Sequence, residues 1–237
     1  MELKWEGVMP AVTTKFTDDD QLDMVAFEKS ILKQIEIGVS GIILGGTLGE
    51  ASTLSNQEKE VLLKSTLSIA EGKVPVIINI AEQTTKDGIA AAQAAEKAGA
   101  HGLMILPPMR YKATDRETVV FFREIAQSTS LPIMIYNNPV DYKIEVTLDM
   151  FEELIEEDNI QAVKESTRNV SNVTNFKNRF GDRVKIFPGV DTLAFECLVA
   201  GADGWVAGIV AAYPEETVAI YKLVKAGRIE EALKIHR

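Results

Sequence analysis

Short apolar runs alternate with amphipathic segments along the whole chain. Each run predicts a buried strand, because the strands of a parallel sheet are covered on both faces. Between the runs, apolar residues recur every three or four positions, as in a helix with one buried face. The predicted strands are Val8–Thr14, Gly41–Gly45, Pro75–Ala81, Gly102–Pro107, Pro132–Asn137, Ile160–Glu165, Val184–Pro188 and Gly204–Gly208. The predicted helices are Met24–Ile37, Asn56–Ala70, Lys86–Ala98, Arg116–Ser128, Leu148–Glu157, Val170–Phe180, Thr192–Ala200 and Glu215–Ala226.

Local signals support these boundaries. Residues 55–58 and 114–117 have the Ser/Thr-X-X-Glu spacing of a capping box, and Pro214 stands where a helix would begin. A Gly-X-X-Gly spacing recurs three times, each time between a helix and a strand, and its first glycine suits the left-handed residue that ends a helix. Eight strands alternating with eight helices predict an α/β fold, the (β/α)8 TIM barrel.

The barrel is predicted to occupy residues 1–227 as one catalytic domain. A further amphipathic pattern begins near Ile229, and the sequence ends inside it. We therefore expect residues 228–237 to begin a truncated C-terminal helical region. No Pro/Gly/Ser-rich linker divides the chain.

The composition is that of an ordinary globular protein. Charged residues make up 25% of the 237 residues and hydrophobic ones 46%. The formal net charge of −10 argues against nucleic acid or an anionic membrane as partner. A single cysteine, Cys197, cannot form an internal disulfide, and the N-terminus lacks the pattern of a signal peptide, so we predict a cytoplasmic protein. No apolar stretch is long enough to span a membrane.

Lys164 lies inside an apolar run, where packing does not require an amine. Burial lowers the pKa of a lysine, and the neutral amine is a nucleophile toward carbonyls. Tyr136 ends the preceding strand, and chemistry in such barrels gathers at the C-terminal ends of the strands. Because side chains alternate along a strand, Lys164 and Tyr136 can converge inside the barrel while Glu165 points toward the helices. A nucleophilic lysine beside a phenol predicts a Schiff-base active site.

The glycine-rich loop after the second strand is a second candidate site. Its sequence is Gly45-Gly-Thr-Leu-Gly-Glu50, which lets backbone N–H groups turn inward as an anion nest, with the Thr47 hydroxyl as a further donor. A carboxylate bound there would direct an adjacent carbonyl toward the barrel centre. The alternative is a tight turn without a ligand, and the position of the loop facing Lys164 favours the anion site.

Five motifs occur in order: GTLGE (Gly46–Glu50), YNNP (Tyr136–Pro139), VKES (Val163–Ser166), PGVD (Pro188–Asp191) and GWVAG (Gly204–Gly208). Over nearly the whole chain they resemble the dihydrodipicolinate synthase/N-acetylneuraminate lyase family of class I, Schiff-base barrel enzymes. The resemblance implies that Lys164 forms an imine with a 2-oxo acid and that Tyr136 relays protons. It also implies a homotetramer that needs no cofactor or metal. The substrate-binding residues expected at the barrel mouth are Gly46, Thr47, Leu48, Arg110, Tyr111, Asn138, Gly189, Asp191 and Val206.

Three positions depart from the synthase pattern. The synthase has a second hydroxyl residue where this chain has Leu48, and an arginine for the second substrate's carboxylate where it has Asp141. A relay tyrosine lent by a neighbouring subunit falls near Arg110, where Tyr111 is a candidate substitute. Asp141 would repel an acidic second substrate.

The segments PPMRY, YNNPVDY and GWVAG are more similar to members assigned as 1-pyrroline-4-hydroxy-2-carboxylate deaminases. This similarity implies dehydration and deamination of a cyclic imine carboxylate to 2,5-dioxopentanoate. The alternatives are a 4-hydroxy-tetrahydrodipicolinate synthase, a pyruvate-type 2-keto-3-deoxy acid aldolase or N-acetylneuraminate lyase, and a non-catalytic 2-oxo-acid-binding regulator.

Other reactive side chains have simpler explanations. His101 is expected at the entrance of the fourth strand, the stability face of a barrel. No His/Cys/Asp cluster has metal-ligand spacing, so no metal is predicted. Cys197 is expected as a small core residue. Asp191 either contacts substrate hydroxyls or caps a helix.

Overall fold

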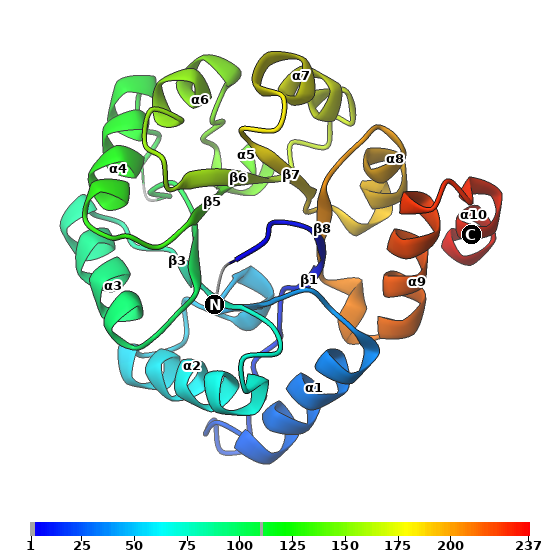
Figure 1. Cartoon of the computed structure of the whole chain (residues 1–237). Helices are drawn as coiled ribbons and strands as arrows, with labels where there is room; N and C mark the ends of the chain where they lie inside the picture. Colours follow the sequence, from blue (N-terminus) through cyan, green and yellow to red (C-terminus); the bar gives the residue numbers. More distant parts are fainter. Residues whose placement is uncertain (1–2, 110) are drawn as a thin grey trace.

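The computed structural model describes residues 3–109 and 111–237, in which parallel strands form an inner ring and helices an outer one (Figure 1). The strands are β1 (Gly7–Pro10), β2 (Ile42–Leu44), β3 (Val76–Ile80), β4 (Gly102–Ile105), β5 (Ile133–Asn137), β6 (Ile160–Glu165), β7 (Lys185–Pro188) and β8 (Gly204–Ala207). The α-helices are α1 (Met24–Ile37), α2 (Asn56–Ala70), α3 (Thr85–Lys97), α4 (Asp115–Gln127), α5 (Pro139–Tyr142), α6 (Leu148–Leu154), α7 (Ser171–Phe180), α8 (Ala194–Val199), α9 (Pro214–Lys225) and α10 (Ile229–His236). Short 3-10 helices are η1 (Thr47–Gly49), η2 (Asp191–Leu193) and η3 (Ile209–Ala211).

Backbone hydrogen bonds close the ring. Strands β2 to β7 form one six-stranded sheet in sequence order, and β1 pairs with β8. The Val12 N–H donates to the Ile43 carbonyl at 3.0 Å on one side, and the Asp203 N–H donates to the Ile186 carbonyl at 2.8 Å on the other. The predicted (β/α)8 barrel is therefore confirmed.

Alternation along the strands separates two apolar layers. One lies between the strands and the helices. The other fills the barrel interior and includes Met9, Ile43, Ile77, Met104, Met134, Tyr136, Ala162, Phe187 and Val206. Lys164 therefore shares the inward-facing side of β6 with Ala162, two positions before it.

The predicted signals operate as expected. Both capping boxes form, with Ser55 and Thr114 as the cap residues. Gly38, Gly99 and Gly201 have φ angles of +89°, +92° and +106°, in the region that favours glycine.

Most element boundaries lie close to the predicted ones, and three differences are notable. The first strand ends at Pro10 instead of Thr14, because the chain then pairs with β2: Ala11 still donates to the Ala207 carbonyl of β8 at 2.9 Å and bridges to Ile43 of β2. The seventh predicted helix is divided into η2 and α8. Helix α5 was not among the predicted helices; the Asn138 side chain accepts a hydrogen bond from the Asp141 N–H and caps it.

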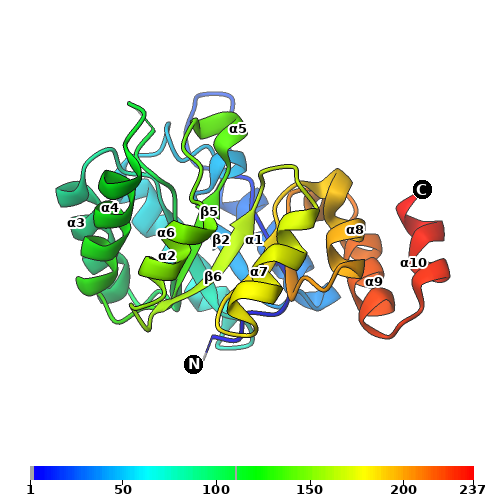
Figure 2. The same cartoon turned by 90° about the horizontal axis from the view of Figure 1, so that it is seen from above.

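Helix α5 and the N-terminus lie at opposite ends of the barrel (Figure 2). Figure 2 shows α5 at the end opposite the N-terminus, together with the loops that follow the strands. Helix α10 packs outside α9 on the flank of the barrel.

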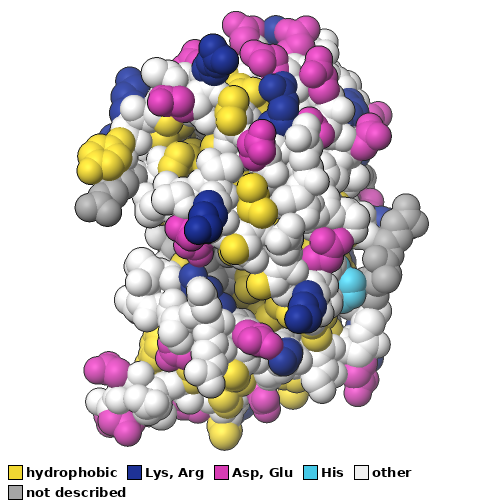
Figure 3. Space-filling model, turned by 90° about the vertical axis from the view of Figure 1, so that its left-hand side faces the viewer, with side chains coloured by type: hydrophobic (Ala, Val, Ile, Leu, Met, Phe, Trp, Pro, Cys, Tyr) yellow, Lys and Arg dark blue, Asp and Glu magenta, His cyan; other side chains and the backbone are white. Residues whose placement is uncertain are grey.

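Over the face seen in Figure 3, acidic and basic side chains are interspersed rather than gathered by charge. Across residues 3–109 and 111–237, no helix has the length and hydrophobicity needed to cross a membrane.

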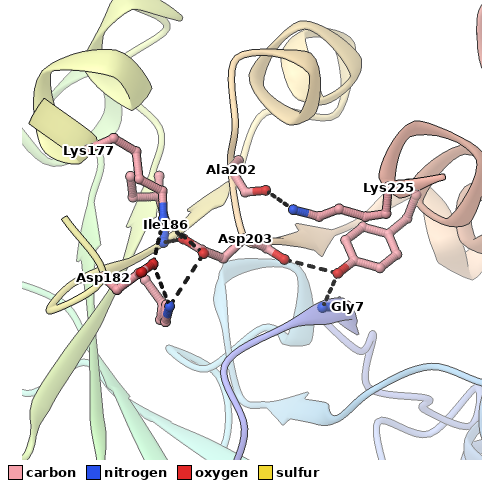
Figure 4. A network of polar contacts seen from close by, with 9 residues as sticks. Gly7, Lys177, Asp182, Ile186, Ala202, Asp203 and Lys225 are labelled. Carbon is pink, nitrogen blue, oxygen red and sulfur yellow. Dashed lines mark hydrogen bonds and ion pairs between the residues drawn. The ribbon is translucent and has the colours of Figure 1, made fainter. Parts of the chain in front are cut away.

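A polar network around Asp203 holds the N-terminal end of the barrel together (Figure 4). Lys177 Nζ donates to both carboxylate oxygens of Asp203 at 2.9 and 2.8 Å, and the Ile186 N–H donates to one of them at 2.8 Å. The Tyr221 hydroxyl donates to the Asp203 carbonyl and accepts from the Gly7 N–H, both at 3.0 Å. The network therefore links β1, β7 and β8 to two helices.

Tyr221→Phe is expected to lower the free energy of unfolding by about 1–3 kcal/mol, because the buried Gly7 N–H loses its partner. Urea denaturation measures the change. The matched control is Tyr213→Phe, because Tyr213 is 57% exposed. Loss of its hydroxyl should lower the free energy of unfolding by less than about 0.5 kcal/mol. Equal stability of the two variants would show that the Tyr221 hydroxyl does not stabilise this end.

Candidate active site

Lys164 and Tyr136 meet inside the C-terminal mouth of the barrel. They are register partners on β6 and β5. Each side chain is buried, with 6% of its surface exposed. Lys164 Nζ lies 3.9 Å from the centroid of the Tyr136 ring. The structure thus brings together the two residues that the sequence singled out.

Burial lowers the pKa of Lys164 to about 8, and the nearby negative charge of Asp191 opposes this shift only in part. At pH 7 about a tenth of the amine is then neutral, whereas an exposed lysine is neutral in only about 3 of 10,000 molecules. The fold alone therefore supplies a nucleophilic amine near neutral pH.

Gly189 leaves room for the Lys164 side chain. A Cβ atom added at this position would lie 2.5 Å from Lys164 Cε and 2.2 Å from Ser166 Oγ. The Gly189 N–H donates to the Glu165 carbonyl at 2.9 Å, so the backbone cannot easily move away. Gly189 thus sets the position of the amine without contributing a side chain.

Gly189→Ala is expected to lower the rate of adduct formation at Lys164 about 10–100-fold, because the new methyl group displaces the lysine stem. Borohydride trapping with mass spectrometry measures this rate. Gly41→Ala is the control, because its added Cβ would lie at an ordinary 3.4 Å from the Met9 side chain. Wild-type trapping rates in both variants would contradict the steric role of Gly189.

Tyr136 is held as a protonated phenol. Burial is the main cause that raises its pKa, and the charge of Asp141 adds to this effect. Asn138 Nδ2 donates to the Tyr136 hydroxyl at 3.2 Å and to the Asp141 carboxylate at 2.7 Å. Since the hydroxyl oxygen accepts from Asn138, its own proton is available for transfer.

Tyr142 was not among the predicted site residues. Its hydroxyl is hydrogen-bonded to Thr47 Oγ1, and its ring packs edge-to-face on Tyr136 with the centroids 5.6 Å apart. Burial raises its pKa to about 12. The Asn138-Pro139 helix start was the available signal, because one helical turn from Asn138 directs the fourth residue back over the mouth.

The loop after β2, where the sequence predicts a carboxylate site, forms a tight turn. Gly45 has a φ angle of +62°, and η1 begins at Thr47. The N–H groups of Gly49 and Glu50 donate hydrogen bonds within this turn. The N–H groups of Thr47 and Leu48 precede them at the start of η1, where helical N–H groups have no partner within the helix. Leu48 is 50% exposed and lies against Gly208.

Asp191 caps the segment after β8. Its carboxylate accepts hydrogen bonds from Trp205 Nε1 at 3.1 Å, from the Gly208 N–H at 3.1 Å and from the Ile209 N–H at 2.8 Å. Of the two interpretations of Asp191, these contacts favour the cap, although of η3 rather than of its own helix. Val206 is buried in the barrel interior beside Met9 and can provide apolar surface only.

Of the two candidates in the loop after β4, only Tyr111 belongs to the described residues. Arg110 lies outside the described residues. Tyr111 is 77% exposed in the loop after β4. Among the other titratable residues, His101 Nδ1 accepts from the Val76 N–H at 3.0 Å, in keeping with a structural role.

Glu165 points outward, as predicted. Its carboxylate accepts from the Thr167 N–H at 2.8 Å and from Asn137 Nδ2 at 3.3 Å. The Cys197 thiol is buried in the outer layer, and burial raises its pKa to about 11, so it is not a nucleophile near neutral pH. Within the part of the chain that the structure describes, no group of three His, Cys, Asp or Glu side chains is placed to hold a metal ion.

Known proteins resemble this chain along nearly its whole length. Residues 4–237 match the dihydrodipicolinate synthetase family. The 4-hydroxy-tetrahydrodipicolinate synthases of Exiguobacterium sibiricum and Persephonella marina are each 31% identical, over 98% of this chain and 79% of their own. The crystal structure of dihydrodipicolinate synthase from Aquifex aeolicus has a TM-score of 0.93 and 28% identity, over 98% of this chain and 79% of its own. The crystal structure of a putative dihydrodipicolinate synthetase from Pseudomonas aeruginosa has a TM-score of 0.93 and 31% identity, over 98% of this chain and 80% of its own.

Proposed function

This chain belongs to the dihydrodipicolinate synthetase family, and we propose that it converts a small 2-oxo acid, such as pyruvate, through a Schiff base on Lys164. The observation that carries this proposal is the buried amine of Lys164 at 3.9 Å from the Tyr136 ring. As in the class I lyases of the family, the chain is an enzyme whose chemistry needs a lysine and a proton carrier.

The first steps follow from the positions of these two groups. The neutral amine of Lys164 attacks C2 of the 2-oxo acid, and the carbonyl oxygen leaves as water after protonation, so that an imine forms. Tyr136 supplies and recovers protons, since its ring lies 3.9 Å from Lys164 Nζ and its phenol, whose pKa is raised, keeps its proton at neutral pH. Loss of a proton from C3 then gives an enamine. Thr47 and the N–H groups of η1 bind the carboxylate.

The fate of the enamine defines the activity. The names of the relatives favour a 4-hydroxy-tetrahydrodipicolinate synthase, in which the enamine attacks the carbonyl of a second substrate. This is the activity we propose first. It takes precedence over the deaminase that the sequence motifs favour, because the relatives and the structurally similar proteins carry the synthase name.

One contact favours the deaminase as a second candidate. Asp141 accepts a hydrogen bond from Asn138, which also holds Tyr136, so a negative charge lies close to the proton carrier. That charge opposes an acidic second substrate. In the deaminase, Lys164 attacks C2 of 1-pyrroline-4-hydroxy-2-carboxylate and opens the ring by imine exchange. A C3 proton and the 4-hydroxyl then leave, and hydrolysis gives 2,5-dioxopentanoate and ammonia.

Borohydride trapping tests the Schiff base directly. Incubation with pyruvate and sodium borohydride is expected to add the mass of the reduced adduct to the peptide that contains Lys164. Calorimetric binding of pyruvate without an adduct would instead identify a non-catalytic binder. Release of ammonia, release of pyruvate and consumption of aspartate semialdehyde then separate the deaminase, the aldolase and the synthase. The homotetramer stays a prediction, which analytical ultracentrifugation tests.

The rate of trapping is expected to rise about tenfold per pH unit up to pH 8 and to level off above it. The reason is that burial lowers the pKa of Lys164 to about 8, and only the neutral amine attacks. Initial trapping rates at saturating pyruvate between pH 6 and 10 measure the profile. A rise that continues to pH 10 would mean that the amine is not held away from water.

A further inference from the structure

Asn79 is a polar side chain in an apolar row of the barrel interior. On β3 it follows inward-facing Ile77 by two positions, so it also faces inward. Its register neighbours across β4, β5 and β6 are Met104, Met134 and Ala162. Asn79 is 5% exposed, and none of these three neighbours can donate a hydrogen bond.

Only half of the Asn79 amide is satisfied. Its Nδ2 donates to the Gly45 carbonyl at 2.9 Å, which fixes the orientation of the amide, because the opposite orientation would set two oxygens against each other. Its Oδ1 is buried and has no hydrogen-bond partner among the described residues. A buried acceptor of this kind costs free energy unless a donor reaches it.

The amide contacts the backbone at the start of the candidate carboxylate loop. Gly45 is the residue before the Gly46–Leu48 turn, so the Asn79 side chain is anchored to the base of that loop. A carboxylate cannot satisfy Oδ1, since both groups only accept. An O–H or N–H group on the carbon chain of the ligand can.

We propose that Asn79 is a specificity-determining residue that accepts a hydrogen bond from a hydroxyl group of the substrate, so that the site prefers hydroxylated 2-oxo acids to pyruvate. This proposal rests on the proposed function, in which the ligand is tethered to Lys164 and its carboxylate lies on the loop after β2. The Nδ2 contact positions the loop for every 2-oxo acid, whereas Oδ1 discriminates among them.

The test compares pyruvate with two hydroxylated 2-oxo acids, hydroxypyruvate and 4-hydroxy-2-oxobutanoate. Half-saturating concentrations are measured by borohydride trapping in the wild type and in Asn79→Leu, which has nearly the same shape. Loss of the Gly45 contact affects all three ligands alike and cancels in their ratio. We expect the preference for at least one hydroxylated ligand over pyruvate to fall about tenfold.

Two controls keep the result interpretable. Asn79→Ala is smaller and covers the case in which leucine prevents folding. Gln34→Leu removes another buried amide with an unpartnered Oε1, on α1 outside the barrel interior, and should leave the ratios unchanged. Equal ratios in the wild type and both Asn79 variants would overturn the inference. Absence of any adduct in the wild type would instead overturn the proposed function.

Discussion

Lys164→Met is expected to abolish both adduct and turnover while raising the free energy of unfolding at pH 7 by about 1–3 kcal/mol. The chemical loss is complete because no other amine lies beside Tyr136 among the described residues. The gain in stability arises because the wild type carries a mostly protonated amine in a buried site, and methionine fills similar space without a charge.

The pH dependence gives this prediction its sign. The pKa of Lys164 is about 8 in the folded protein and 10.5 in the unfolded chain. Between these values the unfolded chain binds more protons, so the stability of the wild type rises with pH from 8 to 10.5. Below pH 8 the full cost of burying the charge is present. The stability difference between Lys164→Met and the wild type should therefore be largest below pH 8 and vanish above 10.5.

Urea denaturation at pH 7 and pH 10 measures the difference. The control is Lys64→Met, because Lys64 pairs with Glu60 on the exposed face of α2 and its charge is not buried. That variant should differ from the wild type by less than about 0.5 kcal/mol at either pH. If Lys164→Met were as stable as the wild type at both pH values, the amine would not be desolvated and its pKa would not be lowered.

Tyr136→Phe is expected to lower kcat about 100- to 10,000-fold, because the site loses the group that carries protons between C2, C3 and solvent. The imine itself still forms, since the amine of Lys164 is retained. Steady-state kinetics should therefore show the loss in kcat, while long incubation with pyruvate and borohydride still labels Lys164. A kcat within threefold of the wild type would exclude Tyr136 as the proton carrier.

Tyr142→Phe is the matched comparison for that experiment. Its hydroxyl contacts Thr47 rather than the amine. Removing it should mainly raise the KM for the 2-oxo acid, because Thr47 loses the partner that orients it toward the carboxylate. A split between kcat and KM for the two phenols would assign them different roles.

The sequence predicted those parts of the site whose signals are local. A charged residue inside an apolar run identified Lys164, and alternation along consecutive strands predicted its meeting with Tyr136. The barrel followed from the repeated strand and helix patterns. The length of the first strand did not, because the change of pairing at Ala11 depends on where β2 lies in the closed ring.

The remaining parts of the site depend on contacts between segments distant in sequence. The need for glycine at position 189 becomes visible only when β7 is placed beside the stem of Lys164. Asn79 resembles any polar residue in a strand until its bond to the Gly45 carbonyl leaves one oxygen without a donor. Tyr142 required recognition of a helix of only four residues.

The ring is not equally continuous around its circumference. The six strands β2 to β7 form one continuous sheet, and β1 and β8 pair with each other. Two short seams, between β1 and β2 and between β7 and β8, close the ring. Lys164 and Tyr136 lie on adjacent strands within the six-stranded sheet, away from both seams. The alignment of amine and phenol therefore depends on the continuous pairing of β5 with β6 and not on the pairing of β1 with β8.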